Sequence, residues 1–152
     1  MTVWETVSRC GLFQGVPDEA RQALVDIASL RTHTAGTTIV YAGDPSHSLY
    51  LIQRGTVEIL AEGPNGLESV VAEIHGRESL QDTYAGSFFG EMSLLDVEPR
   101  SATVRAKTDV AVVTFPVRRL RELLASDKDL HLAVMTNMAR ILSRRLREAN
   151  AR

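Results

Sequence analysis

The amino-acid sequence predicts an α+β fold, in which an all-β region of antiparallel strands lies between an N-terminal helix and two C-terminal helices. Short alternating or β-branched runs, separated by glycine turns, occupy residues 31–115. Apolar residues recur at helical spacing before and after that region. No linker, repeat or low-complexity tract divides the chain. We therefore interpret residues 1–152 as a single domain with zones 1–30, 31–115 and 116–152.

A helix is expected in the second half of the first zone. Pro17 is suited to the start of a helix, because it has no backbone N–H to leave unpaired. The apolar residues that follow it recur at helical spacing, and they are Ala20, Leu24, Ile27 and Ala28.

The central zone contains six runs with strand character. They are Thr37–Tyr41, Leu49–Gln53, Val57–Ala61, Glu68–Ile74, Ala102–Ala106 and Val110–Phe115. Between the third and fourth runs lies Asn65-Gly66, the strongest short hairpin signal, because both residues tolerate a positive φ. Many short strands joined by such turns are typical of a compact roll or sandwich.

Two helices are expected after the strands. Pro116 is suited to the first turn of a helix over about 116–125. Either Ser126 or Asp127 can cap a longer helix over about 128–149.

The longer helix carries two apolar rows. One is a coiled-coil-like seam of Leu132, Met135, Ala139, Leu142, Leu146 and Ala149, and the other consists of Leu130, Val134, Met138 and Ile141. This pattern fits a seam between two copies of the chain, and it equally fits one helix that covers a broad core. Arg145 interrupts the pattern, because it falls inside the apolar face. Its guanidinium either reaches outward past its own apolar stem or stacks on a planar group beneath the helix.

Composition argues against several classes of function. The net charge of -2 and the pI of about 6.1 leave no electrostatic footprint for nucleic-acid binding over the whole surface. No apolar run reaches the roughly 18 residues that span a bilayer, and the N-terminus has no secretory signal, so we expect a cytoplasmic chain without a membrane span. The single Cys10 and the scattered histidines predict no internal disulfide and no metal site. No nucleophile–base signature indicates an enzyme.

Residues 88–104 are the most informative part of the sequence, because they combine groups that hold a small anion bearing hydroxyls. Gly90 permits close backbone approach or a positive φ at the start of a short helix over 91–95, whose free N–H groups attract an anion. Arg100 adds a guanidinium fork suited to a phosphate. Glu91 has a role beside a phosphate if it accepts hydrogen bonds from hydroxyls of the same ligand, or if it pairs with an arginine. A ribose phosphate fits this combination.

This segment resembles the phosphate-binding cassette of cyclic nucleotide-binding domains, a family that includes catabolite activator protein and the regulatory subunit of cAMP-dependent protein kinase. The matching residues are Phe89-Gly90-Glu91-Met92-Ser93-Leu94-Leu95 and Pro99-Arg100-Ser101-Ala102-Thr103-Val104. Weaker matches follow in the right order along nearly the whole chain, from the opening turn Leu12-Phe13 to the closing helices. The resemblance implies an antiparallel β-roll of the double-stranded jelly-roll type.

The resemblance also implies a ligand, either cAMP or cGMP with cAMP favoured, and no cofactor, metal or catalytic residue. Arg100 would hold the cyclic phosphate, and Glu91 would accept the ribose 2′-OH. The other implied members of the site are Gly90, Met92, Ser101 and Ala102 for the sugar-phosphate, Val71 and Leu80 for the base pocket, and Arg145 as a cap over the base.

The implied function is a stand-alone cyclic nucleotide sensor. It would pass its ligand state through the last helix to an unknown protein partner or to a second copy of itself. The alternative is the effector domain of a Crp/Fnr-like transcription regulator without its DNA-binding domain, because no helix-turn-helix follows the last helix before Arg152. These residues by themselves are expected not to bind DNA. An interaction module that has lost its ligand is disfavoured by the intact Glu91 and Arg100, and an enzyme that hydrolyses cyclic nucleotides would need a metal cluster.

Overall fold

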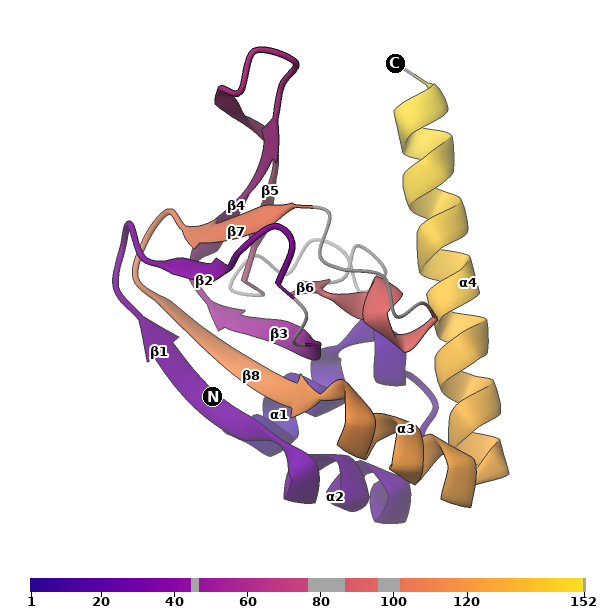
Figure 1. The fold of residues 1–152 in the computed structure, drawn as a ribbon. Helices are drawn as coiled ribbons and strands as arrows, with labels where there is room; N and C mark the ends of the chain where they lie inside the picture. Colours follow the sequence, from indigo (N-terminus) through magenta and orange to yellow (C-terminus); the bar gives the residue numbers. More distant parts are fainter. Residues whose placement is uncertain (45–46, 77–86, 96–101, 152) are drawn as a thin grey trace.

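The structure, a computed structural model, describes residues 1–44, 47–76, 87–95 and 102–151 (Figure 1). The strands within these residues are β1 (Ser29–His33), β2 (Thr38–Val40), β3 (Ser48–Arg54), β4 (Thr56–Glu62), β5 (Glu68–His75), β6 (Phe88–Phe89), β7 (Thr103–Ala106) and β8 (Val110–Pro116). They form two four-stranded antiparallel sheets, with the strand orders β1-β8-β3-β6 and β2-β7-β4-β5. The two sheets make a β-roll, so the predicted fold class is confirmed.

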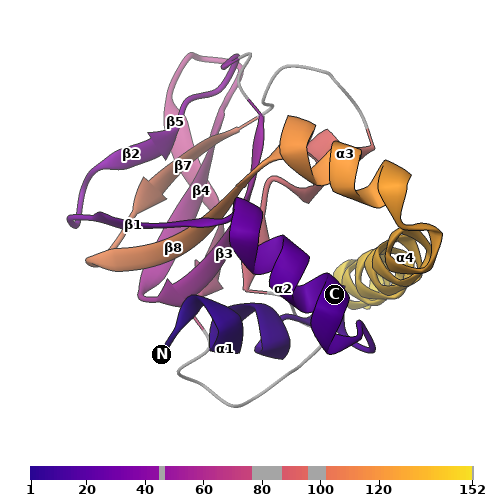
Figure 2. The same cartoon turned by 90° about the horizontal axis from the view of Figure 1, so that it is seen from below.

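Helices gather against one side of this roll (Figures 1 and 2). The helices of the described residues are α1 (Val3–Arg9), the 3-10 helix η1 (Gly11–Phe13), α2 (Asp18–Ile27), the 3-10 helix η2 (Glu91–Leu94), α3 (Val117–Ser126) and α4 (Lys128–Asn150). A capping box of Thr2 and Glu5 begins α1. Of the two predicted caps for α4, the structure uses Asp127, whose carboxylate accepts a hydrogen bond from the Leu130 N–H at 3.0 Å.

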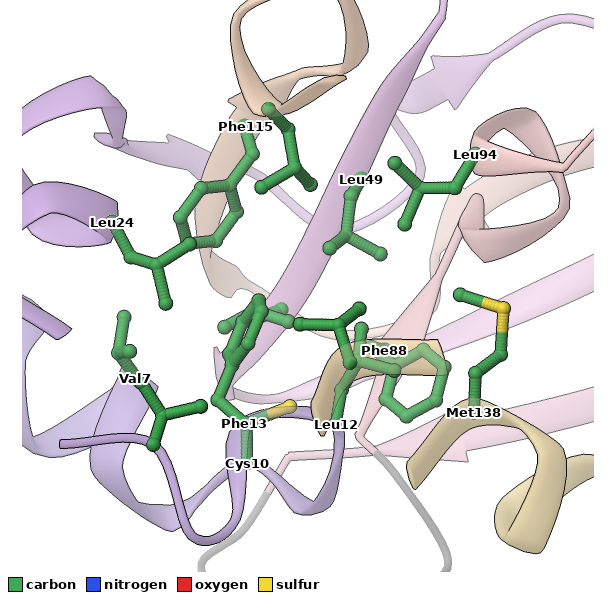
Figure 3. Packing of buried hydrophobic residues seen from close by; sticks show 14 of the residues in the cluster. Val7, Cys10, Leu12, Phe13, Leu24, Leu49, Phe88, Leu94, Phe115 and Met138 are labelled. Carbon is green, nitrogen blue, oxygen red and sulfur yellow. The ribbon is translucent and has the colours of Figure 1, made fainter. Parts of the chain in front are cut away.

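The first sheet separates two apolar clusters. Leu49 and Leu51 of β3 face the helices, whereas Tyr50 and Ile52 face the interior of the roll, because side chains alternate along a strand. Figure 3 shows the helix-side cluster, in which Phe13 packs against Phe115 with ring centroids 5.7 Å apart. The buried residues inside the roll are Val40, Ile52, Val57, Phe89, Val104, Ala106, Val110 and Val112.

Two strands were not predicted. The first is β1, whose residues lie across the boundary between the predicted helical zone 1–30 and the predicted β zone 31–115. Its only large apolar side chain, Leu30, is exposed, so β1 shows no apolar pattern. β1 is a strand because it pairs with the apolar strand β8, from Ser29 opposite Thr114 to His33 opposite Val110. β6 has two residues, too few for any periodicity to be visible. Both strands therefore depend on partners far away in the chain.

The structure assigns one of the two apolar rows of α4 to the core. Leu130, Val134, Met138 and Ile141 are buried and belong to the helix-side cluster. In the seam row, Met135 and Leu142 are partly buried against the same cluster, whereas Leu132 and Leu146 are 68% and 62% exposed. A seam between two copies of the chain therefore stays a prediction. Among the described residues, no helix combines the length and apolarity that crossing a membrane requires.

Candidate functional site

The candidate site begins where β6 ends. Phe88 points into the helix-side cluster, and Phe89 points into the roll, where its ring stacks on Tyr50 with centroids 4.6 Å apart and planes 10° apart. Both clusters therefore hold this two-residue strand in place. Gly90 follows with a φ of 86°, in the left-handed region that glycine enters without strain, and it precedes η2. Of the two roles predicted for Gly90, the structure shows the positive φ.

Glu91 is the first residue of η2 and is buried, with 9% of its surface exposed. Its Oε1 accepts a hydrogen bond from Nη1 of Arg145 at 3.1 Å. Burying an ionised carboxylate is costly unless the charge is paired, so Arg145 stabilises the inward position of Glu91. Of the two roles predicted for Glu91, pairing with an arginine is the one seen in the structure.

Arg145 also contacts an aromatic ring. Its Cζ lies 4.9 Å from the centroid of the Phe88 ring. Of the two positions predicted for Arg145, the structure therefore shows the stacked one, with Phe88 as the planar group. A cation over an aromatic face contributes roughly 0.5–2 kcal/mol, depending on its desolvation. The guanidinium thus joins α4 to both Phe88 of β6 and Glu91, the first residue of η2.

Two further contacts fix η2, and sequence reasoning missed both. The Ser93 carbonyl accepts a hydrogen bond from Nη2 of Arg121 on α3 at 2.7 Å, and the Ser93 hydroxyl lies 3.2 Å from Nδ1 of His47. Leu94 is buried in the helix-side cluster, where Figure 3 shows it beside Leu49. No sequence pattern singles out Arg121 or His47, because their contacts join segments far apart in the chain.

The other predicted site residues are less constrained. Met92 is exposed on η2, Ala102 is half-buried immediately before β7, and Val71 is exposed on β5, at an irregularity in its pairing with β4. Their contacts with a ligand stay predictions. Leu80, Arg100 and Ser101 lie outside the described residues. Within the described part of the chain, no three or more His, Cys, Asp or Glu side chains form a group that could hold a metal ion.

Comparison with protein families identifies the family of this domain. A family model named cyclic nucleotide-binding domain matches residues 30–127, more than half of the chain. The chain belongs to this family. The match spans the β-roll, η2 and α3, and it confirms the resemblance seen in the cassette residues.

Curated relatives of this cyclic nucleotide-binding domain include two longer regulators. The cAMP-activated global transcriptional regulator Vfr of Pseudomonas aeruginosa is 34% identical over 113 residues, which cover 72% of this chain and 49% of Vfr. A CRP-like cAMP-activated global transcriptional regulator of Mycobacterium tuberculosis is 31% identical over 146 residues, which cover 96% of this chain and 59% of the relative. The chain thus spans between 49% and 59% of the length of these two relatives.

Solved structures agree with the assignment. The catabolite activator protein of Thermus thermophilus has a TM-score of 0.73 and 30% identity, covering 93% of this chain and 60% of that chain. The N-terminal domain of a transcriptional regulator from Streptomyces coelicolor has a TM-score of 0.72 and 29% identity, covering 96% of this chain and 95% of that chain.

Proposed function

We propose that this domain is a cyclic nucleotide sensor that prefers cAMP to cGMP, and that α4 transmits its ligand state. The single observation that carries the proposal is the pair between Glu91 of the cassette and Arg145 of α4. This pair joins Glu91, the residue expected to contact the ribose, directly to α4, the helix proposed to transmit the ligand state. The two curated relatives are named cAMP-activated, which supports the choice of cAMP.

In the proposed binding mode, Arg100 holds the cyclic phosphate through its guanidinium fork, and Glu91 accepts the ribose 2′-OH. A carboxylate has about four lone-pair directions, so Glu91 can accept this hydroxyl and still accept the hydrogen bond from Arg145. The remaining contacts come from Gly90, Met92, Ser101 and Ala102 on the sugar-phosphate, and from Val71 and Leu80 on the base.

The relay follows from the position of Arg145. Its charge moves with α4, whereas Glu91 moves with the cassette, so a ligand that changes the geometry of this pair favours one position of the helix over another. The ligand shifts that equilibrium only by the difference in its affinity for the two positions. In the nucleotide complex we place Arg145 beside the base, as a cap that continues to touch the cassette.

The receiver of the signal is proposed to be a second copy of the chain or a protein partner, bound along the seam of α4. The exposed Leu132 and Leu146 of that seam support this choice. A second candidate is the effector domain of a Crp/Fnr-like transcription regulator, because both curated relatives are transcriptional regulators longer than this chain. Sequencing the gene beyond codon 152 separates the two candidates. We propose no catalytic activity and no cofactor for the domain in either case.

Titration calorimetry with cAMP and cGMP tests the proposal. We expect Arg100→Ala to weaken cAMP binding by about 2–5 kcal/mol, because the phosphate loses its counter-charge. Arg100→Lys should recover only part of the affinity, since lysine has no fork. Arg118→Ala is the matched control, because the Arg118 side chain on α3 is 91% exposed. Unchanged affinity in Arg100→Ala would refute the assignment, and tighter binding of cGMP would reverse the stated preference.

A further inference from the structure

A cavity in the roll is lined by residues of β1, β2, β3 and β8. Figure 1 shows β1 and β2 on the side of the roll away from α4. The volume of the cavity is about 340 Å³. Ligand pockets for small molecules begin at roughly 300 Å³, so the cavity has room for a small ligand. No residue that the cassette or the family resemblance assigns to the nucleotide lines it.

The fold turns polar side chains of three neighbouring strands into this cavity. Ser29, Arg31 and His33 line it from alternate positions of β1, and alternate residues of a strand share one face. Ser29 is paired with Thr114 of β8, and Thr114 is paired with Tyr50 of β3. Ser29, Thr114 and Tyr50 therefore form one continuous row across the sheet, which is the floor of the cavity. The polar side chains of β1 extend along the edge of this floor.

The chemistry of the lining favours an anion. Arg31 contributes a permanent positive charge, and no carboxylate is among the described residues that line the cavity. Thr114 Oγ1 is shielded from water and has no hydrogen-bond partner among the described residues. A ligand oxygen that reaches this hydroxyl would supply the hydrogen-bond partner that it lacks.

His33 adds a second group that responds to an anion. Burial, and secondarily the neighbouring Arg31 guanidinium, lower the pKa of His33 below its ordinary value of 6.5. A bound anion near both side chains would offset the repulsion from Arg31 and favour the imidazolium. The rest of the lining mixes the polar Ser48 with apolar or aromatic residues, which are Ile39 of β2, Tyr50 of β3 and Pro116 of β8.

We propose that this cavity binds a small organic phosphate with an apolar or aromatic body. Arg31 and His33 hold the phosphate, the hydroxyl of Thr114 supplies a further hydrogen bond, and Ile39 and Tyr50 contact the body of the ligand. The site is separate from the cassette, so the inference does not depend on the proposed nucleotide function.

Phenyl phosphate is the probe, because it combines a phosphate with one ring. Binding to the full chain is followed by NMR, through the Ile39 methyl signals and the backbone amides of β1, and by calorimetry. We expect saturable binding that weakens at least tenfold in Arg31→Gln and several-fold in His33→Gln. Arg9→Gln, at the exposed end of α1, is the charge-matched control and should bind as the parent does.

The cassette is the alternative binding site for phenyl phosphate, and Arg100→Gln distinguishes the two sites. Binding that persists in Arg100→Gln and is lost in Arg31→Gln supports the cavity. Binding that is lost in Arg100→Gln and kept in Arg31→Gln assigns the probe to the cassette and overturns the proposal. Lack of saturable binding in the parent chain also overturns it. Circular dichroism of each variant shows that the fold is retained, and a separate cAMP titration reports on the proposed nucleotide function alone.

Discussion

Replacing Arg145 by methionine tests the link between α4 and the cassette. Methionine keeps an unbranched apolar stem that can still pack on Phe88, so the change removes mainly the charge and its hydrogen bond. Two opposite charges at the observed 3.1 Å attract each other by roughly 5 kcal/mol at an effective dielectric constant of about 20. Desolvation and side-chain ordering reduce this, and a hydrogen bond between charged groups nets about 1.5–3 kcal/mol.

The exposure of the pair sets the expected coupling. The Arg145 side chain is 33% exposed and the Glu91 side chain 12%, so solvent screens the pair in part and we expect a coupling energy of about 1–2 kcal/mol. Arg145→Met alone should lower the free energy of unfolding by about 2–3 kcal/mol, because it also leaves the buried carboxylate unpaired. Adding Glu91→Gln to this variant should recover part of the loss.

Urea denaturation of the four proteins in the double-mutant cycle, followed by circular dichroism, measures the coupling. Arg140→Met, an exposed arginine of the same helix, is the control for a lost surface charge. A coupling energy below about 0.3 kcal/mol, or a loss in Arg145→Met no larger than that of the control, would refute the reasoning.

Three further predictions follow from single features of the fold. Gly90→Ala should cost about 1–2 kcal/mol and weaken nucleotide binding in calorimetry, because alanine is strained at a φ of 86°; a variant as stable as the parent would contradict this. Asp127→Ala should lower stability by about 1 kcal/mol in thermal denaturation through loss of the α4 cap, with nucleotide affinity unchanged. Burial, and then Arg31, lower the pKa of His33 from 6.5, so the unfolded chain takes up this proton first as the pH falls. Stability should therefore decline as the pH falls below 6.5 until the pH passes the lower folded-state pKa of His33, and His33→Gln should flatten that part of the profile.

The oligomeric prediction has its own measurement. Leu132→Glu places a charge in the exposed seam of α4 without touching the core row. Light scattering should report a dimer for the parent chain and a monomer for the variant. A parent chain that stays monomeric with and without cAMP would contradict the seam between two copies.

Local chemistry made the centre of the site predictable. The positive φ of Gly90 was predictable, because the turn from β6 into η2 needs a conformation that glycine adopts without strain. Glu91 stood out because a carboxylate in a segment suited to an anion requires a specific partner. Asp127 and the hairpin at Asn65-Gly66 were also visible, since caps and tight turns depend on a few adjacent residues.

The interior of the fold was less predictable where contacts join distant segments. The polar strand β1 exists because it pairs with β8, and Arg121 and His47 reach η2 only after the chain has folded. The cavity in the roll combines residues from four strands, none of which forms a motif by itself.

The sequence by itself determined the α+β class, the order of the helical and β zones and the cassette, because these depend on periodicity and on residues close together in the chain. Periodicity also showed that Arg145 interrupts an apolar face, but a helical pattern contains no information about what lies opposite that face. Only the tertiary structure decided that the guanidinium meets Glu91 and Phe88, since a pair 54 residues apart is formed by the packing of α4 against the roll.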